Sequence, residues 1–177
     1  MNAKKINNNF EPYKRVVKFV GSAIIVLLEL AAYYYVWMDC YNRNMTVAFW
    51  RRGNWLIAGE YLILSLVLHR LYGGLKVGIY KYWTLVYSHM LSIVGVNAFS
   101  YVQVVLFDKK MHNPAALLGL TALDFVMVLL WALAFKKIYA AMFPKRRLLL
   151  IYGKKPMFHL VNRIDTRDDK YEIAENI

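Results

Sequence analysis

Three acidic residues, Glu29, Glu60 and Asp124, lie inside long apolar stretches of the sequence. A carboxylate is expensive to place in the hydrocarbon of a membrane, so each of the three is a candidate site by default. Such acids can line a polar cavity or a proton path. They can also form hydrogen bonds between helices, or their side chains can extend so that the carboxylates lie among the lipid headgroups on the outer side. We favour these last two interpretations, which are structural.

The distances of these acids from aromatic residues along the chain predict their depths. Glu29 precedes Tyr34 by five residues, and Glu60 follows Trp55 by five. At about 1.5 Å per residue, both carboxylates are expected about 7–8 Å below the outer aromatic belt, level with each other on adjacent helices. Asp124 falls near the middle of its run. Its candidate hydrogen-bond donors are Lys18, His89, Ser92, Asn97 and Tyr101.

Four apolar runs carry these residues. They extend over Val16–Met38, Trp55–Leu68, Thr84–Phe107 and Ala115–Phe135, and the second is the shortest. Each approaches the roughly 20 residues that a helix needs to cross a bilayer. Hydrophobic residues make up 59% of the 177 residues, which is more than a soluble domain usually carries. The sequence therefore predicts an all-α membrane protein, in which short connectors join a four-helix transmembrane bundle as antiparallel hairpins.

The distribution of Lys and Arg predicts the orientation of these helices. Twelve lie on one side of the predicted membrane: Lys4, Lys5, Lys14, Arg15, Arg70, Lys76, Lys81, Lys136, Lys137, Lys145, Arg146 and Arg147. The other side has five: Arg43, Arg51, Arg52, Lys109 and Lys110. Cationic loops tend to stay in the cytoplasm, so both termini are predicted to be cytoplasmic. The net charge of +12 is then a topological signal and does not require a nucleic-acid partner.

The predicted second connector, His69–Trp83, combines three glycines with aromatic and cationic residues. Tyr and Trp suit the headgroup level, and cations can meet a lipid phosphate. The lipid-phosphate candidates of this connector and of the segment after the fourth run are Arg70, Lys76, Lys81, Lys136, Lys137, Lys145, Arg146 and Arg147. An aromatic-anchored cationic loop without a specific phosphate site is the favoured alternative. The single Cys40 cannot form an intramolecular disulfide, and we predict no metal site.

Residues 144–177 have the pattern of a soluble α/β segment. The fourth helix is expected to continue to Phe143, where Pro144 ends it. A strand over Arg147–Gly153, a helix over Pro156–Ile164 and a strand over Lys170–Ile173 would form a β-α-β unit. Two strands and one helix leave open edges, so this Rossmann-like domain is expected to be incomplete. The predicted organisation is a cytoplasmic segment over 1–15, the bundle over 16–143 and the α/β segment over 144–177.

Several stretches together resemble one family of membrane enzymes. They are the connector Tyr72–Gly78, the Ser88–Tyr101 stretch with Asn97, and Phe143–Gly153, which reads FPKRRLLLIYG. With four membrane helices, they resemble the N-terminal region of bacterial polyprenyl-phosphate hexose-1-phosphate transferases, the initiating sugar transferases of exopolysaccharide and capsule synthesis. The resemblance covers nearly the whole chain, but its motifs consist of Gly, aromatic and basic positions.

The resemblance implies a module that anchors a catalytic domain at the bacterial inner membrane. That domain moves a sugar phosphate from a nucleotide sugar to undecaprenyl phosphate with Mg²⁺. The family's Asp-Glu pair has no counterpart here, so no catalytic residue and no cofactor is assigned to this chain. The implied partners are membrane lipids, undecaprenyl phosphate, the catalytic domain and a second copy of the chain. The alternatives are a small flippase of polyprenyl-linked sugars that uses Glu29, Glu60 and Asp124, and a membrane partner of a separately encoded catalytic subunit.

Overall fold

The computed structural model describes residues 11–143, 146–150 and 171–176. The chain divides into two compact units, one of Arg15–Phe135 and one of Met1–Lys14 with Lys136–Ile177. The first unit contains nearly all of the helical bundle.

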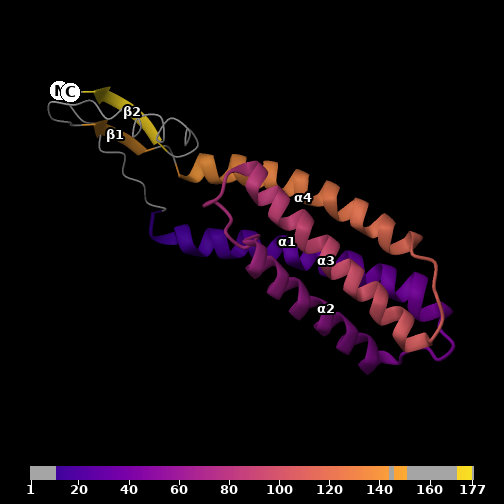
Figure 1. Cartoon of the computed structure of the whole chain (residues 1–177). Helices are drawn as coiled ribbons and strands as arrows, with labels where there is room; N and C mark the ends of the chain where they lie inside the picture. Colours follow the sequence, from indigo (N-terminus) through magenta and orange to yellow (C-terminus); the bar gives the residue numbers. More distant parts are fainter. Residues whose placement is uncertain (1–10, 144–145, 151–170, 177) are drawn as a thin grey trace. The chain divides into compact units, whose positions relative to one another are not determined.

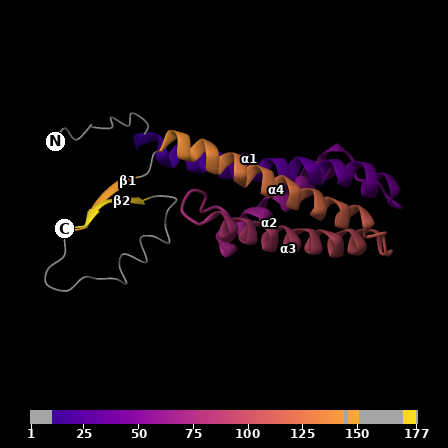
Figure 2. The same ribbon diagram turned by 90° about the horizontal axis from the view of Figure 1, so that it is seen from above.

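Among the described residues, four helices are long and apolar enough to cross a membrane, as predicted. They are α1 over Lys14–Val36, α2 over Arg51–Tyr72, α3 over Tyr82–Asp108 and α4 over Ala115–Met142. Figure 1 shows them as four long rods, and Figure 2 shows α1 and α4 along one side of the bundle and α2 and α3 along the other. Two short helical segments, η2 over Trp37–Tyr41 and η3 over Asn42–Asn44, extend α1. A short η1 over Glu11–Tyr13 precedes it.

The second helix is longer than its apolar run. It ends at Tyr72 because Gly73 adopts a left-handed conformation with φ 84°, which glycine reaches without a steric penalty. The predicted start of the connector at His69 is therefore wrong, and His69 lies in the last turn of α2. The position of His69 on α2 sets the direction in which its side chain leaves the helix.

The bundle has the polarity expected of a protein in lipid. Large apolar side chains point outward, including Phe19 with 75% of its surface exposed and Leu118 with 66%. The buried polar and charged side chains are Ser22, Glu29, Asn42, Asn54, Ser65, His69, His89, Ser92, Asn97, Ser100 and Asp124. An apolar exterior around a polar interior is stable in hydrocarbon, because polar groups that lack water must find partners inside the protein.

Close contacts fix the neighbours of α1. The rings of Tyr33 and Tyr61 stack with centroids 3.9 Å apart, which packs α1 on α2. On another face of α1, a Cβ atom at Gly21 would lie 2.3 Å from the ring of Phe135 on α4. Only a glycine at this position allows the two helices to approach so closely.

Residues 146–150 and 171–176 form two strands. Strand β1, Arg146–Leu150, pairs in parallel with β2, Tyr171–Asn176, with an irregularity between Leu148 and Leu149. A Rossmann-like domain is not seen in the described residues. The helix predicted over Pro156–Ile164 lies outside them, as does Lys145.

Candidate functional site: a buried Glu-His-His cluster

Three ionisable side chains from three helices meet inside the bundle. Glu29 comes from α1, His69 from the last turn of α2 and His89 from the second turn of α3. The His69 Nε2 atom lies 2.8 Å from His89 Nδ1. Glu29 Oε1 lies 3.5 Å from the first of these nitrogens and 3.6 Å from the second. One oxygen and two nitrogens therefore form a compact triangle.

Solvent has no access to this triangle. The exposed fraction is 1% for Glu29 and 0% for both histidines. Glu29 Oε1 has no hydrogen-bond partner in the described part of the chain. A buried carboxylate without strong partners is costly, because the charge loses its hydration and gains little in return. Glu29 is therefore either protonated or balanced by a positive charge close to it.

The outer nitrogens of the two imidazoles are both hydrogen-bond donors. His69 Nδ1 lies 2.8 Å from the carbonyl oxygen of Ser65, and His89 Nε2 lies 3.0 Å from the carbonyl oxygen of Gly74. A carbonyl oxygen can only accept, so each of these nitrogens carries the proton. In a neutral imidazole the other nitrogen then has only a lone pair. Without an added positive charge, two lone pairs would face each other across 2.8 Å.

The glycine pair after α2 makes this arrangement possible. Gly73 ends the helix, and the backbone of Gly74 then passes directly against both imidazole rings. A Cβ atom at Gly74 would lie 2.8 Å from His69 Cδ2 and 3.5 Å from His89 Cδ2. Any larger residue would displace a ring and weaken the hydrogen bond that orients His89.

The rest of the connector is also ordered. The backbone N–H of Lys76 donates to the carbonyl of Gly73, and that of Ile79 donates to the carbonyl of Lys76, at 3.0 and 3.1 Å. Ser22 Oγ on α1 donates to the carbonyl of Leu75 at 3.2 Å. The connector, residues 73–81, is therefore a folded cap over the end of the cluster, and hydrogen bonds hold it to α1 and α3.

The third predicted acid lies in a different network. Asp124 is fully buried on α4, and its Oδ2 atom accepts a hydrogen bond of 3.4 Å from Asn97 Nδ2 on α3. The same amide nitrogen donates to Thr121 Oγ1 at 2.9 Å, and Asn97 Oδ1 accepts from the hydroxyl of Tyr61 at 3.1 Å. Asn97 was among the predicted donors to Asp124, whereas His89 contacts Glu29 and Tyr101 bonds to the carbonyl of His112.

Glu60 is not level with Glu29, and that prediction is wrong. Glu60 accepts a hydrogen bond from Gln103 on α3 and is only partly buried. The residue of α2 that faces Glu29 is Ser65, whose Oγ lies 3.5 Å from Glu29 Oε2. Tyr34 does stack near Trp55 at 5.8 Å, but long aromatic side chains reach along a helix and are a poor ruler for the backbone.

The basic candidates are on the surface where they are described. Arg70, Lys76 and Lys81 are exposed at the connector, and Lys76 donates to the hydroxyl of Tyr80 at 3.1 Å. Lys136 and Lys137 are exposed near the end of α4. Arg146 and Arg147 begin β1, but their side chains lie outside the described part.

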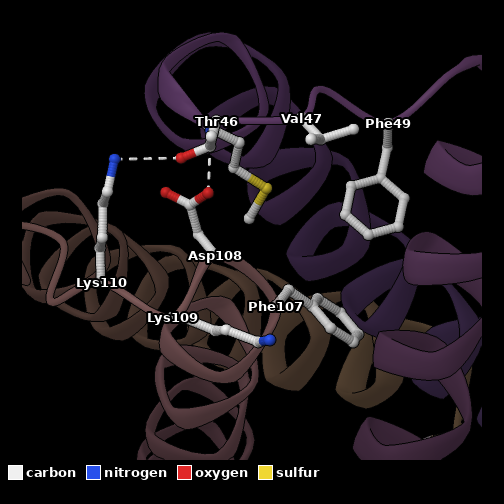
Figure 3. Close-up of a pocket in the computed structure, with 8 residues that line it drawn as sticks. Thr46, Val47, Phe49, Phe107, Asp108, Lys109 and Lys110 are labelled. Atoms are coloured by element: carbon white, nitrogen blue, oxygen red, sulfur yellow. Dashed lines mark hydrogen bonds between the residues drawn. The ribbon is translucent and has the colours of Figure 1, made fainter.

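A surface hollow of about 330 Å³ lies between the segment after α1 and the end of α3. Figure 3 shows the residues that line it. Asp108 is its central polar residue, and Asp108 Oδ1 accepts from the backbone N–H of Thr46 at 2.8 Å. Lys110 donates to Thr46 Oγ1 at 3.1 Å, and His112 Nε2 lies 2.8 Å from Asp108 Oδ2. These polar groups form hydrogen bonds with one another. We therefore interpret the hollow as part of the folded connections between helix ends.

The Glu-His-His cluster was missed from sequence, although each of its residues could be read there. The sequence predicts that Glu29 is level with Glu60, that His69 begins a connector and that His89 is one of several candidate donors to Asp124. The one local signal was His69 four residues before Gly73-Gly74, because a glycine pair lets a backbone approach a buried ring.

No protein-family model, curated protein or solved structure matches this chain. Its function has to be inferred from its own residues and their geometry.

Proposed function

We propose that this chain is the membrane-anchoring module of a sugar transferase. The transferase would move a hexose-1-phosphate from a nucleotide sugar to undecaprenyl phosphate in exopolysaccharide or capsule synthesis. The catalytic residues and their Mg²⁺ would belong to a further domain or subunit that is not part of these 177 residues. The observation that carries the proposal is the junction at the end of α4, where only residues 143–145 separate the helix from a strand that pairs in parallel.

This junction favours an anchor because two parallel strands, β1 and β2, have to be joined by a crossover connection of the kind found in α/β domains. The 20 residues from 151 to 170 separate β1 from β2, and a dozen or more are required to bring a second strand alongside the first in the same direction. A two-stranded sheet has edges that further strands can join. In this proposal, β1 and β2 belong to a β-α-β arrangement that continues as a Rossmann-like domain, and a catalytic domain follows it.

A transferase of this class works where two phases meet. Its nucleotide sugar is dissolved in the cytoplasm, whereas its polyprenyl acceptor lies in the bilayer. With both termini in the cytoplasm of a bacterial cell, the cap between α2 and α3 would lie at the inner face of the membrane. Arg70, Lys76 and Lys81 are exposed there and are available to phosphate groups.

The polar interior fits an anchor better than a flippase. Glu60 bonds to Gln103, Asp124 to Asn97, and Glu29 is surrounded by two histidines. Each acid thus contacts a separate set of partners on neighbouring helices. This is the arrangement expected when buried polar groups hold helices together.

Reading the coding DNA past codon 177 is the first test. We expect the frame to continue, or an adjacent gene to encode a catalytic domain, with an Asp-Glu pair and a basic phosphate-binding segment. The second test replaces the N-terminal membrane region of an active hexose-1-phosphate transferase with this chain. Membranes that contain the chimera should transfer labelled sugar phosphate to undecaprenyl phosphate.

Two results would contradict this function. One is sugar transfer by the chain alone, when purified and supplied with nucleotide sugar, Mg²⁺ and undecaprenyl phosphate. The other is translocation of a labelled polyprenyl-linked sugar by the chain in liposomes, which would favour the flippase. A matched control chimera with an unrelated four-helix membrane module shows whether any anchor suffices.

A further inference from the structure

We propose that Glu29, His69 and His89 bind one divalent transition-metal ion, for which zinc is the best fit. The proposal stands independently of the sugar-transferase function, because it depends only on the geometry of the cluster. The ion would cross-link α1, α2 and α3 directly beneath the cap.

The first argument is the direction of the protons. Both outer ring nitrogens donate to backbone carbonyls, so in two neutral rings the inner nitrogens, His69 Nε2 and His89 Nδ1, turn their lone pairs toward each other at 2.8 Å. Two lone pairs at this distance repel unless one nitrogen carries a proton or both bind a metal ion that lies beside the line between them. A metal ion accepts both, and Glu29 Oε1, which has no hydrogen-bond partner among the described residues, supplies a third donor.

The second argument is the size of the triangle. Its edges of 2.8, 3.5 and 3.6 Å compare with about 3.4 Å between ligands of a tetrahedral zinc ion. A point at about 2.05 Å from all three atoms, the usual zinc bond length, lies about 0.7 Å out of their plane. In a regular tetrahedron the ion lies at the same height, about 0.7 Å, above the plane of three of its ligands.

The third argument is the support behind the ligands. Histidines that bind metals generally donate their second N–H to a carbonyl or a carboxylate, which fixes the ring and its tautomer. His69 donates to the carbonyl of Ser65, and His89 donates to the carbonyl of Gly74. The hydroxyl of Ser65 also lies 3.5 Å from Glu29 Oε2. All three ligands are thus held in place by hydrogen bonds from α2 and the cap.

The donor types select the metal. Two imidazole nitrogens and one carboxylate oxygen suit zinc and other late first-row divalent ions, whereas calcium and magnesium prefer sites built from oxygen. The positive ion also offsets the buried charge of Glu29. Three protein ligands leave a fourth position for a water molecule or another small ligand, as in zinc sites that are not purely structural.

The test is metal content of the full chain, purified in detergent with a tag that carries no histidine. After removal of metal with a chelator and reconstitution with zinc, we expect one tightly held zinc ion per chain. Cobalt(II) in its place should give the visible absorption bands of a four-coordinate ion with nitrogen and oxygen ligands. Glu29→Gln and His89→Gln should each weaken zinc binding at least about 100-fold, the upper end of what loss of a supporting partner costs.

Matched variants separate this site from other carboxylates. Glu60→Gln removes the other intramembrane glutamate, and Asp124→Asn removes the other fully buried acid. Both should retain zinc with the affinity of the wild type. The proposal is overturned if the wild type holds no zinc after reconstitution, in which case a proton shared between the two histidines balances Glu29. It is equally overturned if His69→Gln/His89→Gln binds zinc as the wild type does.

A second measurement, the thermal unfolding midpoint with and without zinc, tests the proposal even if a variant does not fold. Zinc should raise the thermal unfolding midpoint of the chelator-treated wild type, because a ligand that binds only the folded state stabilises it. The midpoint of folded Glu29→Gln should not change. A wild-type midpoint that zinc leaves unchanged would contradict the proposal without reference to any variant.

Discussion

Glu29 and Asp124 are both buried carboxylates in the same bundle, yet their neighbours give them different chemistry. Each has one oxygen without a hydrogen-bond partner among the described residues, and their exposed fractions are 1% and 0%. Asp124 faces an amide N–H₂ and a hydroxyl network through Asn97, so its neighbours offer protons. Glu29 faces the inner nitrogens of two imidazoles, which offer electron pairs when both rings are neutral.

This comparison shows that burial alone does not define a site. A carboxylate surrounded by hydrogen-bond donors joins helices, whereas a carboxylate beside oriented lone pairs can hold a cation. The deciding atoms are the outer ring nitrogens of His69 and His89, since their bonds to backbone carbonyls determine what the inner nitrogens present to Glu29.

Removing one histidine should have the largest effect on stability. His69→Leu leaves the buried Glu29 with a single imidazole, and we expect the free energy of unfolding in detergent to fall by about 3–5 kcal/mol. Unfolding followed by circular dichroism measures this loss. The double variant Glu29→Leu/His69→Leu removes both the charge and its partner, so it should lose less than the sum of the two single variants. Additive losses would show that the two residues do not interact.

Crowding the cap should have the next largest effect. Gly74→Ala places a methyl group 2.8 Å from the ring of His69, and we expect a loss of about 1–3 kcal/mol from overpacking. Zinc affinity should fall about 10- to 100-fold, because the hydrogen bond that orients His89 is disturbed. Gly59→Ala is the matched control, since nothing lies within 4 Å of the added atom, and it should stabilise the helix by about 0.5–1 kcal/mol.

Breaking the Asp124 network should reduce stability without affecting the metal. Asn97→Leu leaves the hydroxyl of Tyr61 without its acceptor and Asp124 without its donor, which should cost about 1–3 kcal/mol. Zinc content should stay at the wild-type level. Asn44→Leu, at an exposed asparagine, should change stability by less than about 0.5 kcal/mol. Loss of zinc from folded Asn97→Leu would show that the two networks act as one.

The smallest effect is expected for Asp124→Asn. The substitution keeps the size of the side chain and exchanges a carboxylate for an amide, so the free energy of unfolding should change by less than about 1 kcal/mol. Zinc binding should be unchanged. If the wild type translocates a polyprenyl-linked sugar in liposomes and this variant does not, Asp124 belongs to a transport path. The interpretation that Asp124 only joins helices would then be wrong.

The helices could be predicted well, and the pairing of their side chains could not. Long apolar runs located all four spans, and Asn97 was correctly included among the donors to Asp124. The apolar run is shorter than α2, because the last turn of the helix contains His69 and Arg70. The helix ends where Gly73 begins the connector. The prediction that Glu29 is level with Glu60 is wrong, because the stacking of Tyr34 on Trp55 does not fix the register of the two helix backbones.

The sequence by itself determined that four apolar helices enclose a few ionisable residues, since apolar length and the cost of charge in lipid are properties of composition and order. Only the tertiary structure decided that Glu29, His69 and His89 meet. These residues come from three helices, and a shift of one helical turn in any of them would separate their side chains. The donor role of His69 Nδ1 follows from the carbonyl of Ser65 one turn earlier in α2, whereas the carbonyl of Gly74 becomes a neighbour of His89 only when the cap folds over the bundle.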